Sequence, residues 1–356
     1  MGATSSWTAG RRYRRARRLR RDRHGVVAVI GTLLALLVFF ALFGIFLTQY
    51  VPLWMTDNES QLTAQASTSF ATFKSAVDAQ YTLNGPQSYG SPFVISSQAV
   101  PLIAQPTQGS LVFLPSTCPG GFFVKGVTPG WNATNNGQPV NPAYCMFANV
   151  TETIGPGGSG LYWQSIASGA LQLTLPNRYY TPENFFFEDD AVIQSQSSGY
   201  QIMAFPPPLN VSNLGGNTTV TSSFLQLYGN ASTVIGQGSE EVYSHLRYSQ
   251  TVISNGRISG SSFTPTKFTF VIGTQYPCAW SPYLYKVVTS SGVAAGNYAL
   301  STSFDSLTTT PLSATFPGSC FNPNGATTLL SFSISGVDYA TLYQAGIQVG
   351  LGVGST

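Results

Sequence analysis

"RRDRHGVVAVIGTLLALLVFF", residues 20–40, joins a cluster of arginines to a run of apolar residues at a single glycine. No charged residue occurs from Val26 to Thr56. An α-helix rises about 1.5 Å per residue and the hydrocarbon core of a bilayer is about 30 Å thick, so about 20 residues span it. The sequence therefore predicts a membrane-spanning helix over residues 26–55. It belongs to a secretory signal, a permanent anchor, or the leader and helix of a filament subunit.

A cleaved secretory signal fits this stretch poorly. Such a signal has an apolar region of about 7–15 residues that ends in a small-x-small site, whereas this longer run ends in "TQYVPLWM". Nine of the sixteen basic residues are arginines within residues 11–23. Lys and Arg just before an apolar span keep that end of the chain in the cytoplasm. Residues 1–25 are thus predicted to be a cytoplasmic leader, not a nucleic-acid-binding arm, and the chain after about residue 57 is expected outside the cell membrane, as in a single-pass protein.

The expected extracellular part contains four cysteines, Cys118, Cys145, Cys278 and Cys320. An even number of cysteines suits an oxidising compartment. Three pairings are possible, and Cys118–Cys145 with Cys278–Cys320 is favoured because each closes a local loop. Two pairs of buried free thiols are the alternative.

N-x-S/T sequons also suit an exported, glycosylated surface. The candidate acceptors are Asn132, Asn149, Asn210, Asn217 and Asn230. A sixth sequon, at Asn58, lies too close to the expected membrane to be a good acceptor.

Residues 56–84 have the periodicity of an amphipathic helix. Apolar residues recur at steps of three and four, which places them on one helix face: Leu62, Ala66, Phe70, Phe73, Val77 and Tyr81. Thr56 and Glu59 have the spacing of a capping box at the start, and Asn84-Gly85-Pro86 is a strong stop signal. Pro52 predicts a kink or short break between this stalk helix and the membrane span.

The remaining residues, 85–205 and 206–356, have the alternating pattern of β-strands. In "TTLLSFSISG" and "KFTFVIG" apolar residues fall on one face and mostly Ser or Thr on the other, and Gly/Pro-rich turns separate such runs. The predicted fold class is therefore α+β: a long N-terminal helix followed by a large antiparallel β-sandwich ectodomain, as one or two sandwiches. Pro206–Pro208 is the candidate boundary between the two parts, unless it is a loop within one domain.

Few residues suggest catalysis or a bound cofactor. His245 is the one histidine after the leader, which leaves no partner for a His-rich metal site. The acidic run Glu188, Asp189 and Asp190 is a weak candidate for a Ca²⁺ site or for the carboxylates of a glycosidase. Successive strand residues point to opposite faces, so a charged strand start is the favoured interpretation, and Glu240-Glu241 is interpreted likewise. We expect neither an enzyme nor a cofactor; an anchored glycan hydrolase is the alternative.

The stretch "HGVVAVIGTLLALLVFFALFGIF" resembles the class III signal of archaeal type IV pilins and archaellins, including a "V-I-G-T-L" motif at residues 29–33. The resemblance implies that a prepilin-peptidase-like enzyme cuts between Gly25 and Val26 and leaves the apolar helix in the mature protein. The region "NRYYTPENFFFEDDAVIQSQSSGYQIMAFPPPLNV" is also similar to a segment of uncharacterised archaeal pilin-like surface proteins.

This resemblance implies a subunit of an extracellular filament or related assembly, whose partners are the lipid bilayer, other pilin-like subunits or surface ligands. The head is larger than that of a typical major pilin, which favours a minor subunit. His24 stands where Lys or Arg usually precedes the glycine. The alternative is therefore a permanently anchored type II membrane protein whose β ectodomain serves adhesion or envelope structure.

Overall fold

The computed structural model describes residues 9–83, 87–100, 103–115, 134–135, 138–139, 145–152, 162–167, 169–254, 257–258, 265–304, 310–311 and 328–352. The chain divides into two compact units. The smaller consists of residues 1–57 and 100–105, and the larger of residues 58–99 and 106–356.

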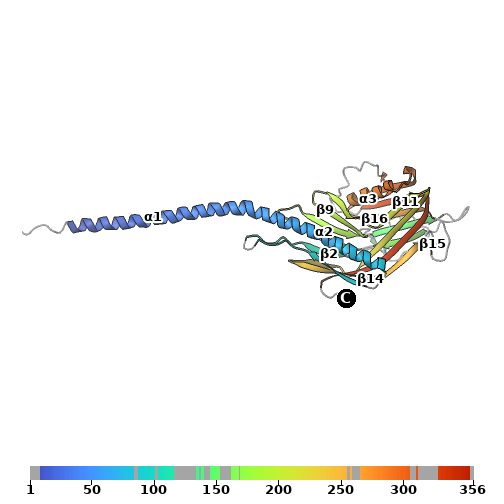
Figure 1. The fold of residues 1–356 in the computed structure, drawn as a ribbon, viewed down its shortest axis with the longest axis horizontal. Coiled ribbons are helices and arrows are strands. Elements are labelled where there is room, and N and C mark those ends of the chain that lie inside the picture. Colours follow the sequence, from blue (N-terminus) through green and yellow to red (C-terminus); the bar gives the residue numbers. More distant parts are fainter. Residues whose placement is uncertain are drawn as a thin grey trace, which may run out of the picture. The chain divides into compact units, whose positions relative to one another are not determined.

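An unbroken helical run begins at Ala9 (Figure 1). It consists of α1 (Ala9–Ile45), the π-helical turn η1 (Phe46–Tyr50) and α2 (Val51–Leu83). A kink or a short break was expected at Pro52; the helix is not broken there, and it widens into η1 immediately before the proline. Proline has no N–H to donate, and its ring crowds the carbonyl four residues back. A π-turn at this position relieves the crowding without ending the helix.

The smaller unit has a core of its own. Val51 and Met55 of α2 are buried against Val100, with Phe46 and Ala104 partly buried beside them. The amide of Ala104 donates a hydrogen bond of 3.0 Å to the carbonyl of Val100, which closes a tight turn. Within the described part of this unit, the core therefore covers only the C-terminal end of the apolar stretch.

Most strands of the larger unit form three six-stranded sheets. The first sheet has the order β1 (Ser88–Val94), β14 (Ser239–Ser254), β20 (Val337–Leu351), β12 (Asn217–Tyr228) and β11 (Leu209–Leu214), with β15 (Arg257–Ile258) paired to β14. The second sheet has the order β10 (Gln201–Phe205), β9 (Ala191–Gln196), β8 (Glu183–Glu188), β7 (Ala170–Leu175), β2 (Ser110–Leu114) and β13 (Ser232–Ile235). The third sheet has the order β18 (Thr310–Pro311), β17 (Tyr298–Phe304), β19 (Thr328–Ser335), β16 (Pro265–Thr274), β5 (Cys145–Glu152) and β6 (Tyr162–Ala167).

The remaining elements are a two-stranded ribbon, β3 (Thr134–Asn135) with β4 (Gln138–Pro139), the helix α3 (Pro277–Ser290) and the short 3₁₀ helix η2 (Ala295–Asn297). The fold class is thus α+β, with an N-terminal apolar helix followed by mostly antiparallel sheets, as predicted. Among the described strand pairs, β12 and β20 alone run parallel. A parallel pair needs a long crossover connection, and here the crossover contains α3 and much of the third sheet.

Strand β8 of the second sheet is buried on both faces. Phe185 and Phe187 of β8 lie in a cluster that includes α2, named here the helix-side core. Phe186, between them, lies in a second cluster that includes the third sheet and α3, named the α3-side core. Because successive residues of a strand point to opposite faces, one phenylalanine-rich strand supplies both cores. The alternation predicted for β16 and β19 is confirmed, since the α3-side core contains Phe268, Phe270 and Ile272 of β16 and Leu330, Phe332 and Ile334 of β19.

The stripe predicted for the stalk helix is confirmed in α2. Leu62, Ala66, Phe70, Phe73 and Val77 are at most 2 % exposed and belong to the helix-side core. Tyr81 packs against the same core, partly buried. Phe70 meets Phe93 of β1 edge-on with ring centroids 5.0 Å apart. Complete burial of such a side chain stabilises a fold by about 1.5–3 kcal/mol, so this stripe fixes the helix on the sheets.

Pro206–Pro208 connect β10 to β11. Leu209 and Val211 of β11 lie in the α3-side core, and Met203 of β10 packs against the same core. The strands on either side of the prolines therefore share one core, and the division of the ectodomain at this point stays a prediction.

Candidate functional site

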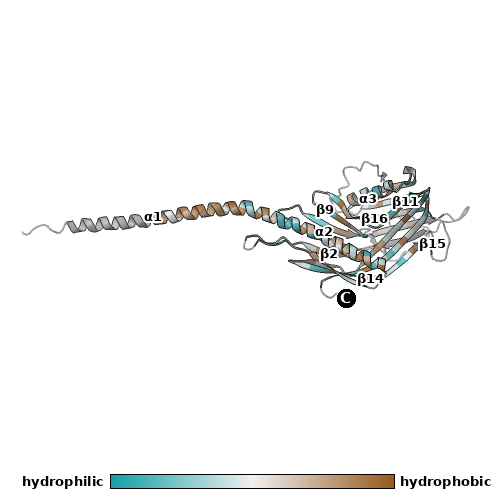
Figure 2. Ribbon diagram, viewed as in Figure 1, coloured by the Kyte–Doolittle hydropathy of each residue, from teal (hydrophilic) through white to brown (hydrophobic). Residues whose placement is uncertain are grey.

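Figure 2 shows an apolar stretch in the N-terminal helix, and the large apolar side chains of this stretch are exposed. Val27, Leu37 and Phe40 are 68 %, 66 % and 58 % exposed. The described residues contain one helix that is long and apolar enough to cross a membrane, and it is this one. A helix that is apolar all round is stable only when a protein core or a bilayer surrounds it. The chain is thus built as a surface or membrane-anchored protein with a β-rich domain.

A buried carboxylate connects the start of the larger unit's helix to a loop. Glu59 of α2 is fully buried and accepts hydrogen bonds from the backbone amides of Tyr179 and Tyr180, both at 2.7 Å, and of Arg178 at 3.1 Å. The hydroxyl of Thr107 donates to the same carboxylate. Successive amides that converge on one anion form a backbone nest. Glu59 therefore holds the β7–β8 loop against α2.

The prediction of a capping box at Thr56 and Glu59 is wrong, because both residues lie inside α2. Because the helix runs on from η1 into α2, the amides near Thr56 already have helical partners and need no cap. The hydroxyl of Thr56 instead donates 2.9 Å to the carbonyl of Pro52, one turn back.

The acidic run predicted to start a strand forms a buried turn. Glu188 ends β8, and Asp189 and Asp190 form the turn to β9 with φ of 48° and 63°. Left-handed backbone at both central residues is typical of a type I′ hairpin turn, where aspartate is one of the few tolerated residues. All three side chains are at most 1 % exposed. The turn thus carries three carboxyl groups into the interior.

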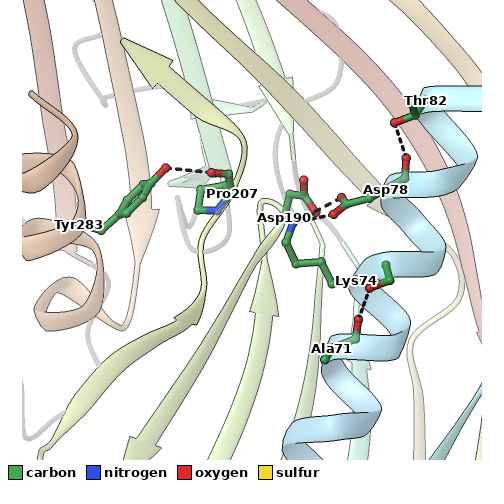
Figure 3. Close-up of polar contacts among 8 residues, drawn as sticks. Ala71, Lys74, Asp78, Thr82, Asp190, Pro207 and Tyr283 are labelled. Atoms are coloured by element: carbon green, nitrogen blue, oxygen red, sulfur yellow. Dashed lines mark hydrogen bonds and ion pairs between the residues drawn. The ribbon is translucent and has the colours of Figure 1, made fainter. Parts of the chain in front are cut away.

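The carboxyl groups of Glu188 and Asp190 contact different elements. Glu188 Oε1 accepts hydrogen bonds from the hydroxyl of Thr274, at 2.5 Å, and from the indole of Trp280 on α3, at 2.6 Å. Asp190 Oδ1 instead lies 2.8 Å from Nζ of Lys74 on α2 (Figure 3). Within the described part of the chain, no group of three or more His, Cys, Asp or Glu side chains is placed to hold a metal ion.

Burial dominates the protonation of this turn. It raises the pKa of Glu188 to about 7, although the hydrogen bonds from Thr274 and Trp280 act in the opposite direction. The pKa of Asp189 rises well above its ordinary value because of burial and then the neighbouring charges of Glu188 and Asp190. Burial also raises the pKa of Asp190, against the opposing charge of Lys74 and with a further increase from Asp78. Burial in this turn therefore raises the pKa of all three carboxyls.

Lys74 is shared between two carboxyls. Its side chain is 12 % exposed, and Nζ lies 3.3 Å from Asp78 Oδ2, one helical turn away, in addition to its contact with Asp190. Figure 3 shows Lys74 extending from α2 to both acids. On the other side of the turn, Tyr283 of α3 donates 2.8 Å to the carbonyl of Pro207.

A cavity of about 330 Å³ lies beside the C-terminal end of α2. It is lined by Tyr81, Thr82, Ser223, Phe224, Leu225, Ser249, Tyr343, Gln344 and Ala345. The lining combines aromatic rings, hydroxyls and an amide with the apolar side chains of Phe224, Leu225 and Ala345.

The structure places most of the glycosylation and cleavage residues that were predicted from the sequence. Asn210, Asn217 and Asn230 are exposed, Asn149 lies in β5 and Asn132 lies outside the described residues. Gly25 and Val26 lie within α1. Their cleavage and glycosylation stay predictions.

Cys278 is disulfide-bonded. Cys118, Cys320 and the side chain of Cys145 lie outside the described residues, so both expected pairings stay predictions. His245 of β14 contacts the hydroxyl of Ser88 through Nδ1 at 2.7 Å, as a cross-strand pair.

Sequence reasoning missed Lys74, Asp78 and the position of Glu59 in the backbone nest. Lys74 is the sole lysine of α2 and lies beside the apolar stripe. That position was the one available signal that its charge has an internal partner.

No protein-family model matches this chain, and no curated protein or solved structure is significantly similar to it. The basis for a function is therefore the chain's own residues: an exposed apolar helix, a carboxylate nest and a buried acidic turn.

Proposed function

We propose that the chain is a pilin-like cell-surface protein, a minor subunit of an extracellular filament or related assembly. One observation carries the proposal: a continuous helix, Val27–Leu83, that is apolar and exposed in its first part and buried against sheets in its second. The first part needs a partner that the described residues do not supply. The resemblance of residues 20–55 to class III signals supplies a route to that partner.

The chemistry of assembly follows from charge. With the arginine-rich leader in place, the N-terminus stays in the cytoplasm and the helix spans the membrane. Cleavage between Gly25 and Val26 removes all nine leader arginines. The remaining apolar helix then leaves the bilayer and packs with identical or related helices, which buries apolar surface at about 25 cal/mol per Å². The β-rich head faces solvent, carries any glycans and binds a surface or partner subunits.

A permanently anchored type II protein with an adhesive or envelope role is the second candidate. It is favoured by His24, which stands where a Lys or Arg usually precedes the glycine. In this case the leader is retained and the head works as a tethered ectodomain. We assign no chemical reaction to the chain in either case.

The two candidates differ in what shear releases from intact cells. The experiment compares the wild-type chain with Gly25→Val, which blocks peptidase recognition, and with Gly31→Ala as the matched control. A Cβ at Gly31 meets no atom within 4 Å, so the control leaves the helix unchanged. A filament subunit predicts that shear releases the wild type and Gly31→Ala but not Gly25→Val. Equal retention of all three in the membrane contradicts the filament role and favours the permanent anchor.

A further inference from the structure

Lys74 of α2 and Asp190 of the β8–β9 turn form an ion pair that is largely excluded from solvent. The amine is almost buried, the carboxyl is completely buried, and Nζ lies 2.8 Å from Oδ1. We propose that Lys74 and Asp190 join through an intramolecular isopeptide bond, a covalent tie between α2 and the β8–β9 turn. This inference does not depend on the filament role, because it concerns only the larger unit.

The geometry places the reacting atoms close together. A carboxyl C–O bond is about 1.2 Å long, so Nζ lies no more than about 4 Å from Cγ of Asp190. Attack occurs from separations of about 3–3.5 Å. The left-handed turn fixes Asp190 on one side, and the buried stripe of α2 fixes Lys74 on the other. The two groups are therefore held near each other by the whole fold, not by a flexible loop.

The reaction is a condensation. A proton first moves from the Lys74 ammonium to the Asp190 carboxylate, which gives a neutral amine and a carboxylic acid. The amine lone pair attacks Cγ, the C–N bond forms, and the carbonyl π electrons move to oxygen. When these electrons return, the C–O bond to the hydroxyl breaks. The products are one amide and one water, and no oxidant, reductant or activated co-reactant is required.

Asp78 is placed to carry the proton. Its Oδ2 lies 3.3 Å from Nζ of Lys74, and the same side chain is close enough to Asp190 to raise that pKa through charge and hydrogen bonding. It can accept the proton that the attacking nitrogen releases and deliver it to the departing hydroxyl. Asp78 is partly exposed, with 37 % of its side chain accessible, so the released water has a path outward.

Burial favours the protonated form of the Asp190 carboxyl and the amide product. The raised pKa of Asp190 means that its carboxyl tends to hold a proton, and loss of water from a buried neutral pair leaves no charge inside. An ion pair at the same place keeps two charges that are both poorly solvated. The amide thus removes a desolvation penalty that an ion pair retains.

The test is peptide mapping of the reduced full-length chain by mass spectrometry. A crosslink predicts a branched peptide that contains Lys74 and Asp190 and is lighter than the two linear peptides by one water. It also predicts that trypsin does not cut after Lys74. Recovery of the wild-type chain with a linear Lys74 peptide cut by trypsin overturns the proposal.

Two variants separate a covalent bond from a salt bridge. Lys74→Arg keeps the positive charge but loses the amine nucleophile, so the branched peptide is expected to disappear. Lys286→Arg, at an exposed lysine of α3, is the matched control and is expected to retain it. Asp78→Asn is expected to lower the crosslinked fraction several-fold, and an unchanged fraction overturns the role given to Asp78. Because the wild-type measurement needs no variant to fold, the proposal can fail on it alone.

Discussion

Glu59 and Asp190 are both fully buried carboxyls that connect α2 to the rest of the larger unit, but their surroundings differ. Glu59 accepts hydrogen bonds from three backbone amides and a hydroxyl. Asp190 contacts one amine, that of Lys74, which it shares with Asp78. A buried carboxyl is therefore held by a backbone nest in one place and by a single lysine side chain in the other.

Glu59→Gln tests the nest. The substitution keeps the shape but removes the charge and turns an NH₂ group toward amide donors. Hydrogen bonds to charged groups contribute about 1.5–3 kcal/mol each, so we expect the free energy of unfolding to fall by about 3 kcal/mol. Chemical denaturation of the full chain in detergent measures it. Glu241→Gln, at an exposed carboxylate that accepts from Tyr243, is the control, with a change within about 0.5 kcal/mol. Equal effects of the two substitutions would show that the nest contributes nothing specific.

Glu188 predicts a pH dependence of stability. Its pKa rises from 4.5 to about 7 on folding, so the native state holds the proton more tightly than the unfolded state. Stability is then greatest below pH 4.5 and falls as the pH rises to about 7, by about 3 kcal/mol from this group. Glu188→Gln mimics the protonated form. As the pH rises from 4.5 to about 7, we expect the wild type to lose stability relative to this variant. Parallel curves for the two proteins between pH 4.5 and 7.5 would contradict this origin.

At the scale of elements, α2 is the member that the sequence predicts best. Steps of three and four place its apolar residues on one face whatever they pack against, and the five stripe positions Leu62, Ala66, Phe70, Phe73 and Val77 are all buried. The strands of the third sheet were predictable in the same way. The widening at η1 was anticipated only as a disturbance at Pro52, because the way in which a helix relieves proline strain depends on its surroundings.

The buried contacts between elements could not be predicted from the sequence. Lys74 and Asp190 lie 116 residues apart in the chain, and Glu188 and Thr274 lie 86 apart. Local patterns carry no information about such pairs. The acidic run therefore favoured a charged strand start, since acids are rarely buried without partners. The parallel pairing of β12 with β20 was missed for the same reason, because alternation alone does not give strand direction.

Phe73→Ala tests the attachment of α2 to the sheets. The ring of Phe73 is fully buried and meets Phe187 edge-on at 5.1 Å. Truncation of a buried Phe costs about 3–5 kcal/mol, and we expect a loss of that size in the free energy of unfolding. Ser75→Ala, at an exposed position of the same helix, should change it by less than about 0.5 kcal/mol. A small effect at Phe73 would mean that the helix is held mainly by its polar contacts.

At the scale of the whole molecule, charge and apolar surface are separated along the chain. The leader concentrates the positive charge, the helix after it has none, and the remaining residues hold seven bases and twelve acids. This order favours a membrane-inserted chain with its basic end in the cytoplasm and its β-rich domain outside.

Leu37→Arg tests membrane insertion. Leu37 is exposed near the middle of the apolar stretch, and an arginine at the centre of a spanning helix costs about 2.5–3.5 kcal/mol. We expect the variant to shift from the membrane fraction to the soluble or degraded fraction. Thr32→Ala, which removes only a hydroxyl bonded to the carbonyl of Val29, should stay in the membrane. Unchanged membrane recovery of Leu37→Arg would contradict insertion of this helix.

The most direct measurement is the N-terminal residue of the mature chain, obtained by mass spectrometry of protein recovered from native membranes and from sheared surface fractions. A filament subunit predicts a chain that begins at Val26 and lacks residues 1–25. A chain that still carries the arginines of residues 11–23 in both fractions would contradict the filament role and leave a permanently anchored surface protein.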